Sequence, residues 1–92
     1  MWRDTVIPVP FADIPPEVLR ARIAERIREI AERRGIPLTQ VADRGKVSRT
    51  HMWDVLAGRS APTSDFLAKL ANVLRVEPME FMRPPRKPRA PK

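Results

Sequence analysis

The sequence contains no cysteine, only one histidine and no long apolar run. Without cysteine the chain can form neither disulfide bonds nor thiolate zinc sites, and thiol catalysis is excluded. A single histidine is too few for a transition-metal site of the usual kind, so we expect no metal and no other cofactor. No apolar segment approaches the roughly 18 residues that a membrane-spanning helix needs. With no signal-peptide pattern in the first 15 residues, we expect a cytoplasmic protein without membrane contact.

Length and charge predict one small domain with a basic end. Ninety-two residues allow one domain. The net charge of +7 is uneven, because residues 83–92 hold five basic residues and no acid, which leaves residues 1–82 with a net charge of +2. Four prolines in the same stretch disfavour a helix, so we expect a disordered basic tail. Such a tail is either a solvated terminus or a flexible arm that is attracted to phosphate groups.

Residues 1–15 are apolar but interrupted by three prolines. Since proline lacks a backbone donor, this stretch is at best an edge strand or an extended arm. It is too apolar for a purely solvated terminus, and we expect it to lie on the domain or on a second copy of the chain. Its candidate dimer or partner contacts are Trp2, Val6, Ile7 and Phe11.

Residues 16–82 carry the pattern of five helices and no core strand. The first begins at Pro16 and ends at Gly35, with apolar residues at positions 19, 23, 27 and 30 along one face. The arginines and glutamates between them are expected on a solvated face. Four shorter helices are predicted at about residues 36–44, 49–57, 64–74 and 76–82. The predicted fold class is therefore all-α, a compact five-helix domain between an extended N-terminal arm and the basic tail.

Residues 36–58 predict a helix-turn-helix, two short helices around a tight turn that contains Gly45. Ser48 is the expected cap of the second helix, and Thr63 is the expected cap of the helix at 64–74, because each hydroxyl can accept from a free backbone N–H. Apolar residues at positions 47, 52, 55 and 56 are expected to anchor that helix in the core. A unit of this kind places its second helix in the major groove of DNA.

The ordered pattern from about residue 27 to residue 82 resembles the phage-repressor/Cro-like helix-turn-helix family, also called the xenobiotic-response-element type. The similarity rests on residues 27–30, 35–36, 41–42, 47–50, 62–63 and 67–76, with Gly58 and the apolar residues at 52, 55, 81 and 82. The resemblance implies a five-helix domain, bacterial or phage in origin and associated with the nucleoid. Its third helix would recognise an operator in double-stranded DNA, usually as a homodimer. Arg75 stands where the family often has glycine, so a positive φ there would strain the backbone.

The resemblance also implies which residues meet DNA. Arg49, Thr50 and Asp54 match positions that contact base edges: the first can bind guanine, the second a thymine methyl group and the third the cytosine amino group. Trp53 is either a packing residue, a groove or sugar contact, or an anchor for another protein. Asp54 is alternatively a solvated acid that repels phosphate. The expected contacts to the DNA backbone are Arg44, Lys46, Ser48, His51, Arg59 and Ser60.

These residues predict a sequence-specific transcriptional regulator, a repressor or autoregulator that binds an inverted repeat as a homodimer. No enzymatic activity and no small-molecule substrate are expected, since His51 is the only candidate for acid–base chemistry. The alternative is a protein-interaction module, such as an antitoxin or adaptor, that binds a toxin or another regulator through the N-terminal arm or the Trp53 face. Near the other end, we expect core or dimer contacts from Met79, Phe81 and Met82.

Overall fold

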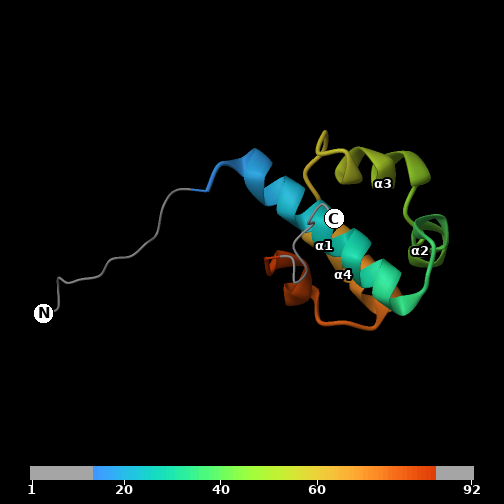
Figure 1. Ribbon diagram of the computed structural model, residues 1–92. Helices are drawn as coiled ribbons and strands as arrows, with labels where there is room; N and C mark the ends of the chain where they lie inside the picture. Colours follow the sequence, from blue (N-terminus) through green and yellow to red (C-terminus); the bar gives the residue numbers. More distant parts are fainter. Residues whose placement is uncertain (1–13, 85–92) are drawn as a thin grey trace, which may run out of the picture.

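The computed structural model describes residues 14–84, and this part of the chain contains helices and no strand. It confirms the all-α class. The described helices are α1 (Pro16–Arg34), α2 (Leu38–Gly45), α3 (Arg49–Leu56), α4 (Ser64–Leu74) and the 3₁₀ helix η2 (Pro78–Met82) (Figure 1). Most of the predicted arm and tail lie outside the described residues, and so do the four predicted contacts Trp2, Val6, Ile7 and Phe11.

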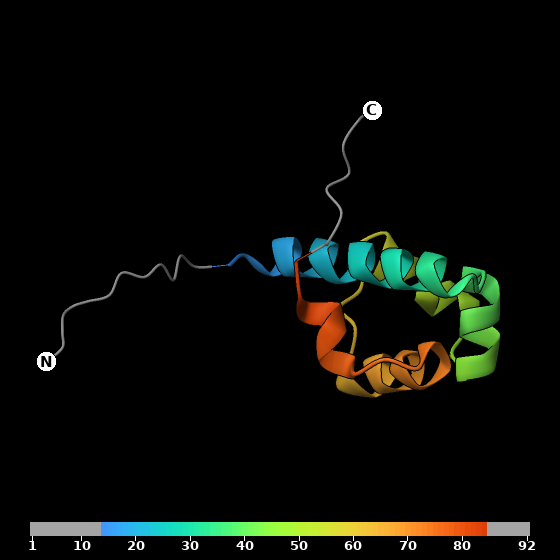
Figure 2. The ribbon, with the colours of Figure 1, turned by 60° about the horizontal axis from the view of Figure 1, so that its bottom comes forward.

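The helices enclose one core, with α1 and α4 on opposite sides of it. Figure 2 shows α2 closing one end of this arrangement and η2 the other. In agreement, α2 packs on α4, η2 packs on both α1 and α4, and α3 lies against α1 and α2. The core side chains come from all five helices, and Ile27, Met52, Leu70 and Phe81 are among those with no exposed surface. The two helices of the predicted helix-turn-helix therefore rest on a scaffold made by the other three.

The fifth predicted helix differs from the other four, because it is a five-residue 3₁₀ helix and not an α-helix. It begins at Pro78, and Pro84 soon follows, which disfavours helical backbone in the residue before it. Phe81 is fully buried and is a core residue, the first of the two roles predicted for it. Met79 and Met82 are 64% and 39% exposed, so these two remain candidates for contacts with a partner.

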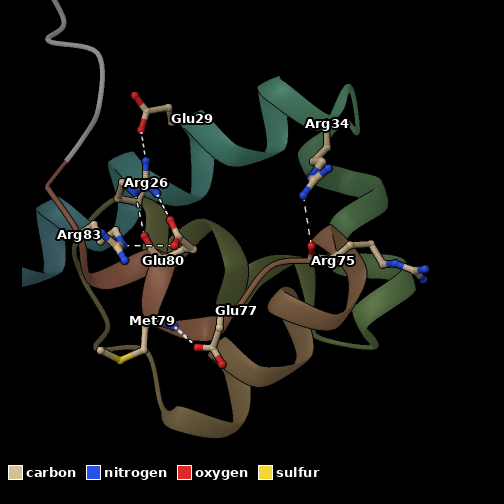
Figure 3. Close-up of polar contacts among 8 residues, drawn as sticks. All are labelled: Arg26, Glu29, Arg34, Arg75, Glu77, Met79, Glu80 and Arg83. Atoms are coloured by element: carbon tan, nitrogen blue, oxygen red, sulfur yellow. Dashed lines mark hydrogen bonds and ion pairs between the residues drawn. The ribbon is translucent and has the colours of Figure 1, made fainter.

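The helix ends confirm several local predictions. Gly35 ends α1 in the left-handed region, with φ 69°. The hydroxyls of Ser48 and Thr63 accept from the backbone N–H of the third residue of α3 and of α4, at 2.9 and 3.0 Å. Arg75 ends α4 with φ 61°, as the resemblance implied, and its carbonyl accepts from Arg34 of α1 at 3.2 Å (Figure 3). This cross-helix bond supports a backbone conformation that is unfavourable for a residue with a side chain.

Gly45 has a different role from the one predicted. It is the last residue of α2 and lies outside the turn, while Lys46 adopts the left-handed conformation with φ 60°. A Cβ atom on Gly45 would lie 3.5 Å from a methyl group of Val73 and 3.6 Å from the carbonyl oxygen of Lys69. Both are ordinary van der Waals distances, so Gly45 lies against α4 with room for a methyl group, and the turn of the helix-turn-helix consists of residues 46–48.

Arg26 corrects the prediction that the charged residues of α1 form a solvated face, because its side chain is only 1% exposed. It donates to the Glu80 carbonyl oxygen at 2.8 Å and forms ion pairs with Glu80 at 3.0 Å and with Glu29 at 2.6 Å (Figure 3). Glu80 also pairs with Arg83 at 3.2 Å. A buried guanidinium needs such partners, and they fix η2 on the side of α1.

Removing this guanidinium should destabilise the fold. We expect Arg26→Ala to lower the free energy of unfolding by about 3 kcal/mol. This value is near the lower end of the cost of removing one partner from a buried ion pair, because the carboxylates of Glu29 and Glu80 are partly exposed. Urea denaturation measures this loss. The control is Arg33→Ala on the same helix, an exposed residue whose removal should cost less than about 0.5 kcal/mol. Equal losses in both variants would contradict the structural role of Arg26.

Candidate nucleic-acid interface

Helix α3 has one buried face and one exposed face. Met52, Val55 and Leu56 are buried in the core, as predicted, whereas Arg49, Thr50 and Trp53 are exposed. The helical repeat of 3.6 residues produces this division. An isolated helix of eight residues is not stable in water, so the buried face and the contacts at its two ends must maintain the conformation of α3.

Both ends of α3 are stabilised by hydrogen bonds. At the start, Ser48 caps the helix by accepting from the backbone N–H of His51. At the other end, two arginines of α1 donate to backbone carbonyls: Arg28 to Leu56 at 3.4 Å and Arg20 to Gly58 at 3.2 Å. Cations are favourable at the C-terminal end of a helix. These two arginines were also predicted on a solvated face; Arg28 is exposed as predicted and Arg20 is half-buried, and both in addition connect α1 to the end of the predicted recognition helix.

Arg49 is paired with Asp43, a residue that the sequence did not single out. The Nε and Nη2 atoms of Arg49 donate to Oδ1 and Oδ2 of Asp43 at 3.2 and 2.8 Å, across the turn between α2 and α3. The hydrogen bond from Arg49 lowers the pKa of the Asp43 carboxyl, and the same bond raises the pKa of Arg49. Both side chains remain more than half exposed, so the pair is accessible from solvent.

Asp54 and Arg59, predicted as a base contact and a phosphate contact, are paired with each other. The Nε and Nη2 atoms of Arg59 both donate to Oδ1 of Asp54, at 3.1 and 2.9 Å. The Asp54 backbone carbonyl also accepts from the backbone N–H groups of Arg59 and Ser60. These bonds order the loop that follows α3. The Arg59 side chain still has 67% of its surface exposed, so it remains accessible to a phosphate group.

The remaining predicted contacts occupy different environments. The His51 ring packs edge-on against the Phe66 ring, with centroids 5.0 Å apart and an angle of 84° between the planes. Trp53 is 40% exposed on α3. It lies one helical turn from Arg49, on the same face. Arg44 donates to Gln40 at 3.1 Å, and Lys46 is exposed in the turn.

The predicted contacts thus gather around α3, the turn before it and the loop after it. A basic groove between α2 and α4 lies beside the turn and is lined by Arg44, Gly45, Lys46, Lys69, Asn72 and Val73. The surface around α3 can therefore donate hydrogen bonds to base edges and place cations near phosphates. Of the helices in residues 14–84, none has both the length and the apolar character required to cross a bilayer.

Comparisons with known proteins agree with this geometry. Residues 22–81 match the sequence profile of the helix-turn-helix domain family. The fold is similar to the restriction-modification controller protein C.AhdI from Aeromonas hydrophila, with 24% identity, a TM-score of 0.64, and 67% of this chain and 94% of that chain covered. A hypothetical transcription factor, NHTF from Neisseria, is 26% identical with a TM-score of 0.69, and the match covers 86% of this chain and 91% of that chain.

A third similar structure is an HTH_3 family transcriptional regulator from Vibrio cholerae, 25% identical with a TM-score of 0.67. The match covers 73% of this chain and 38% of that chain, so the Vibrio protein contains a large region without a counterpart in the present chain. A search of curated protein sequences finds no match. The comparisons therefore establish the family and the fold, while the roles of individual residues come from the geometry of α3 and its surroundings.

The Asp43–Arg49 pair can be tested by titration. NMR detection of the Asp43 carboxyl carbon should show a pKa below the ordinary aspartate value, and Arg49→Ala should return it toward that value. Because the folded-state pKa is lowered, the stabilising effect of the pair is present above the unfolded-state pKa and is lost as the pH falls through the folded-state value. The control Arg44→Ala should leave the titration unchanged. The same midpoint with and without Arg49 would show that the pair does not form in solution.

Proposed function

This chain belongs to the helix-turn-helix domain family, and we propose that it is a sequence-specific transcriptional regulator that inserts α3 into the major groove of DNA. The observation that carries this proposal is the amphipathic character of α3, whose apolar side is anchored in the core while Arg49, Thr50 and Trp53 face solvent. The major groove admits one α-helix. Helix α2, which packs against α3, would then lie across the backbone beside the groove.

The charges around α3 suit two kinds of DNA contact. Arg49 can donate two hydrogen bonds to O6 and N7 of guanine, and Thr50 can contact a thymine methyl group. Arg44, Lys46 and Arg59 are exposed on the flanking segments and would bind phosphates without distinguishing one sequence from another. Of the acids near α3, Asp43 and Asp54 are each already paired with an arginine, which reduces their repulsion of the DNA backbone.

We further propose that the protein acts as a homodimer on an inverted repeat. A helix of eight residues contacts only a few base pairs, so a second copy supplies the remaining specificity. Two copies related by a two-fold axis would place their α3 helices about 34 Å apart, one turn of DNA. The exposed apolar residues Ile14, Val18, Met79 and Met82 lie outside α3 and are the contacts that we propose for a dimer in which α3 stays free.

The regulatory role that we propose is repression, including repression of the protein's own promoter. Two of the similar structures are described as a hypothetical transcription factor and a transcriptional regulator, which supports control of transcription. A dimer of this size bound over a promoter would exclude RNA polymerase by occupying the same DNA. Repression therefore needs no activity beyond tight and selective binding.

One observation favours a second function, the recognition of another protein. Trp53 exposes 40% of its surface on α3, and tryptophan is enriched among residues that dominate protein interfaces. A protein-binding module of this kind, such as an antitoxin or adaptor, would use the Trp53 face or the N-terminal arm. The two functions can coexist in one chain, because a partner that covers α3 would release the protein from DNA.

The DNA-binding function is tested by selecting duplexes from a random pool and measuring affinity against salt concentration. The wild type should select an inverted repeat. Arg49→Ala should lose about 1–3 kcal/mol of discrimination at one base pair of each half-site. Arg59→Ala should instead weaken binding to all sequences alike. It should also lower the slope of log affinity against log salt concentration by about one, because one fewer counterion is released on binding. Failure of the wild type to prefer any sequence would contradict the proposal.

The two candidate functions are separated by a pull-down after DNase digestion. If α3 serves DNA alone, Trp53→Ala should weaken DNA binding and no stoichiometric protein should remain bound to the wild type. The control Met79→Ala removes an exposed apolar side chain from η2, which does not contact α3, and should leave the binding of a partner protein to the Trp53 face unchanged. A stoichiometric partner that survives digestion and is lost with Trp53→Ala, together with no DNA footprint, would support the protein-binding function instead.

A further inference from the structure

The contact between Asp43 and Arg49 joins the two helices of the helix-turn-helix at the point where base recognition is proposed. Asp43 lies in α2 and Arg49 is the first residue of α3. Both oxygens of the carboxylate accept from the guanidinium, which makes the contact bidentate and fixes the plane of the arginine group. In contrast, Arg59 donates to only one oxygen of Asp54.

The backbone beneath Asp43 is well supported. Its chain neighbours Val41 and Ala42 have no exposed surface, and Gly45 packs closely against Lys69 and Val73 of α4. Packing therefore fixes the backbone of α2 that carries the Asp43 carboxylate, although the side chain itself faces solvent. A long arginine side chain without such a partner would sample many rotamers, and fixing it on DNA would cost conformational entropy.

The donors left on Arg49 are those that guanine requires. An arginine group has five N–H donors in one plane, and Asp43 uses the edge formed by Nε and Nη2. One N–H of Nη2 and both of Nη1 remain, so the outer edge of the group still presents two parallel donors. Guanine offers O6 and N7 as a matching pair of acceptors in the major groove.

We propose that Asp43 is the positioning residue for Arg49, and that it determines sequence preference by presenting this outer edge to guanine. The inference rests on the proposed DNA-binding function. Asp43 also limits contacts with the wrong sequence, because an Arg49 that turns to a phosphate gives up both bonds to the carboxylate. Without Asp43, the arginine can bind phosphates anywhere on the duplex, so binding becomes less selective as the protein gains one positive charge.

The test compares Asp43→Ala with the wild type on the duplex that the wild type selects and on the same duplex with the contacted guanine replaced. The preference for guanine, measured as the ratio of the two affinities, should fall about tenfold in the variant, a change within the range of one bidentate contact. Its affinity for random duplex should stay the same or rise. The double variant with Arg49→Ala should lose no more preference than Arg49→Ala alone, and Asp43→Glu, which retains a carboxylate, should restore part of it.

Glu17→Ala provides the matched control, since it removes an equally exposed negative charge from the first turn of α1 and should leave the preference for guanine unchanged. Equal thermal melting of both variants shows that folding is intact. An Asp43→Ala protein that keeps its full preference, or that loses affinity equally for every duplex, overturns the role of Asp43 while DNA recognition stands. A wild type that selects no sequence overturns both proposals.

Discussion

The structure depends on the constraint that an eight-residue helix must be held in place by the rest of the domain. Helix α3 is too short to be stable alone. Its conformation comes from three buried side chains, the Ser48 cap and two arginines of α1, which bind the carbonyl of its last residue and a carbonyl just after it. Every proposed interaction with DNA starts from side chains on this helix or beside it. Its exposed face is therefore only as well ordered as the scaffold beneath it.

The arginines of α1 join parts of this scaffold to one another and to α3. Arg20 and Arg28 contact the end of α3, whereas Arg26 is buried against η2 and bound to Glu80 and Glu29. Helix α1 thus connects α3 to η2 at the opposite end of the domain through polar groups as well as apolar packing. Buried ion pairs are not strong sources of stability, but the Glu80 contacts define one position for η2, a short helix with only Phe81 in the core.

Features that depend on neighbouring residues could be predicted from the sequence, and features that join distant residues could not. The caps at Ser48 and Thr63 and the end of α1 at Gly35 follow from local backbone chemistry, whereas the positive φ of Arg75 was implied by the family resemblance. The burial of Arg26 depends on Glu80, 54 positions away, and no local pattern distinguishes it from the other arginines of α1. Gly45 predicts a turn, but it is the last residue of α2, and a Cβ atom there would meet Val73 and Lys69 only at ordinary contact distances. Asp43 was overlooked because its partner lies across the turn, although the two are only six positions apart.

The insertion of α3 into DNA is tested most directly by recording amide NMR spectra of the full chain while adding the duplex that it selects. If α3 enters the major groove, the largest changes in chemical shift should fall on residues 49–54, with further changes in the turn at 46–48 and the loop at 59–60. Amides of η2, which does not contact α3, should change little. Large shifts on α1 and η2 with α3 unaffected would show that DNA binds another surface, and α3 would then not be the recognition helix.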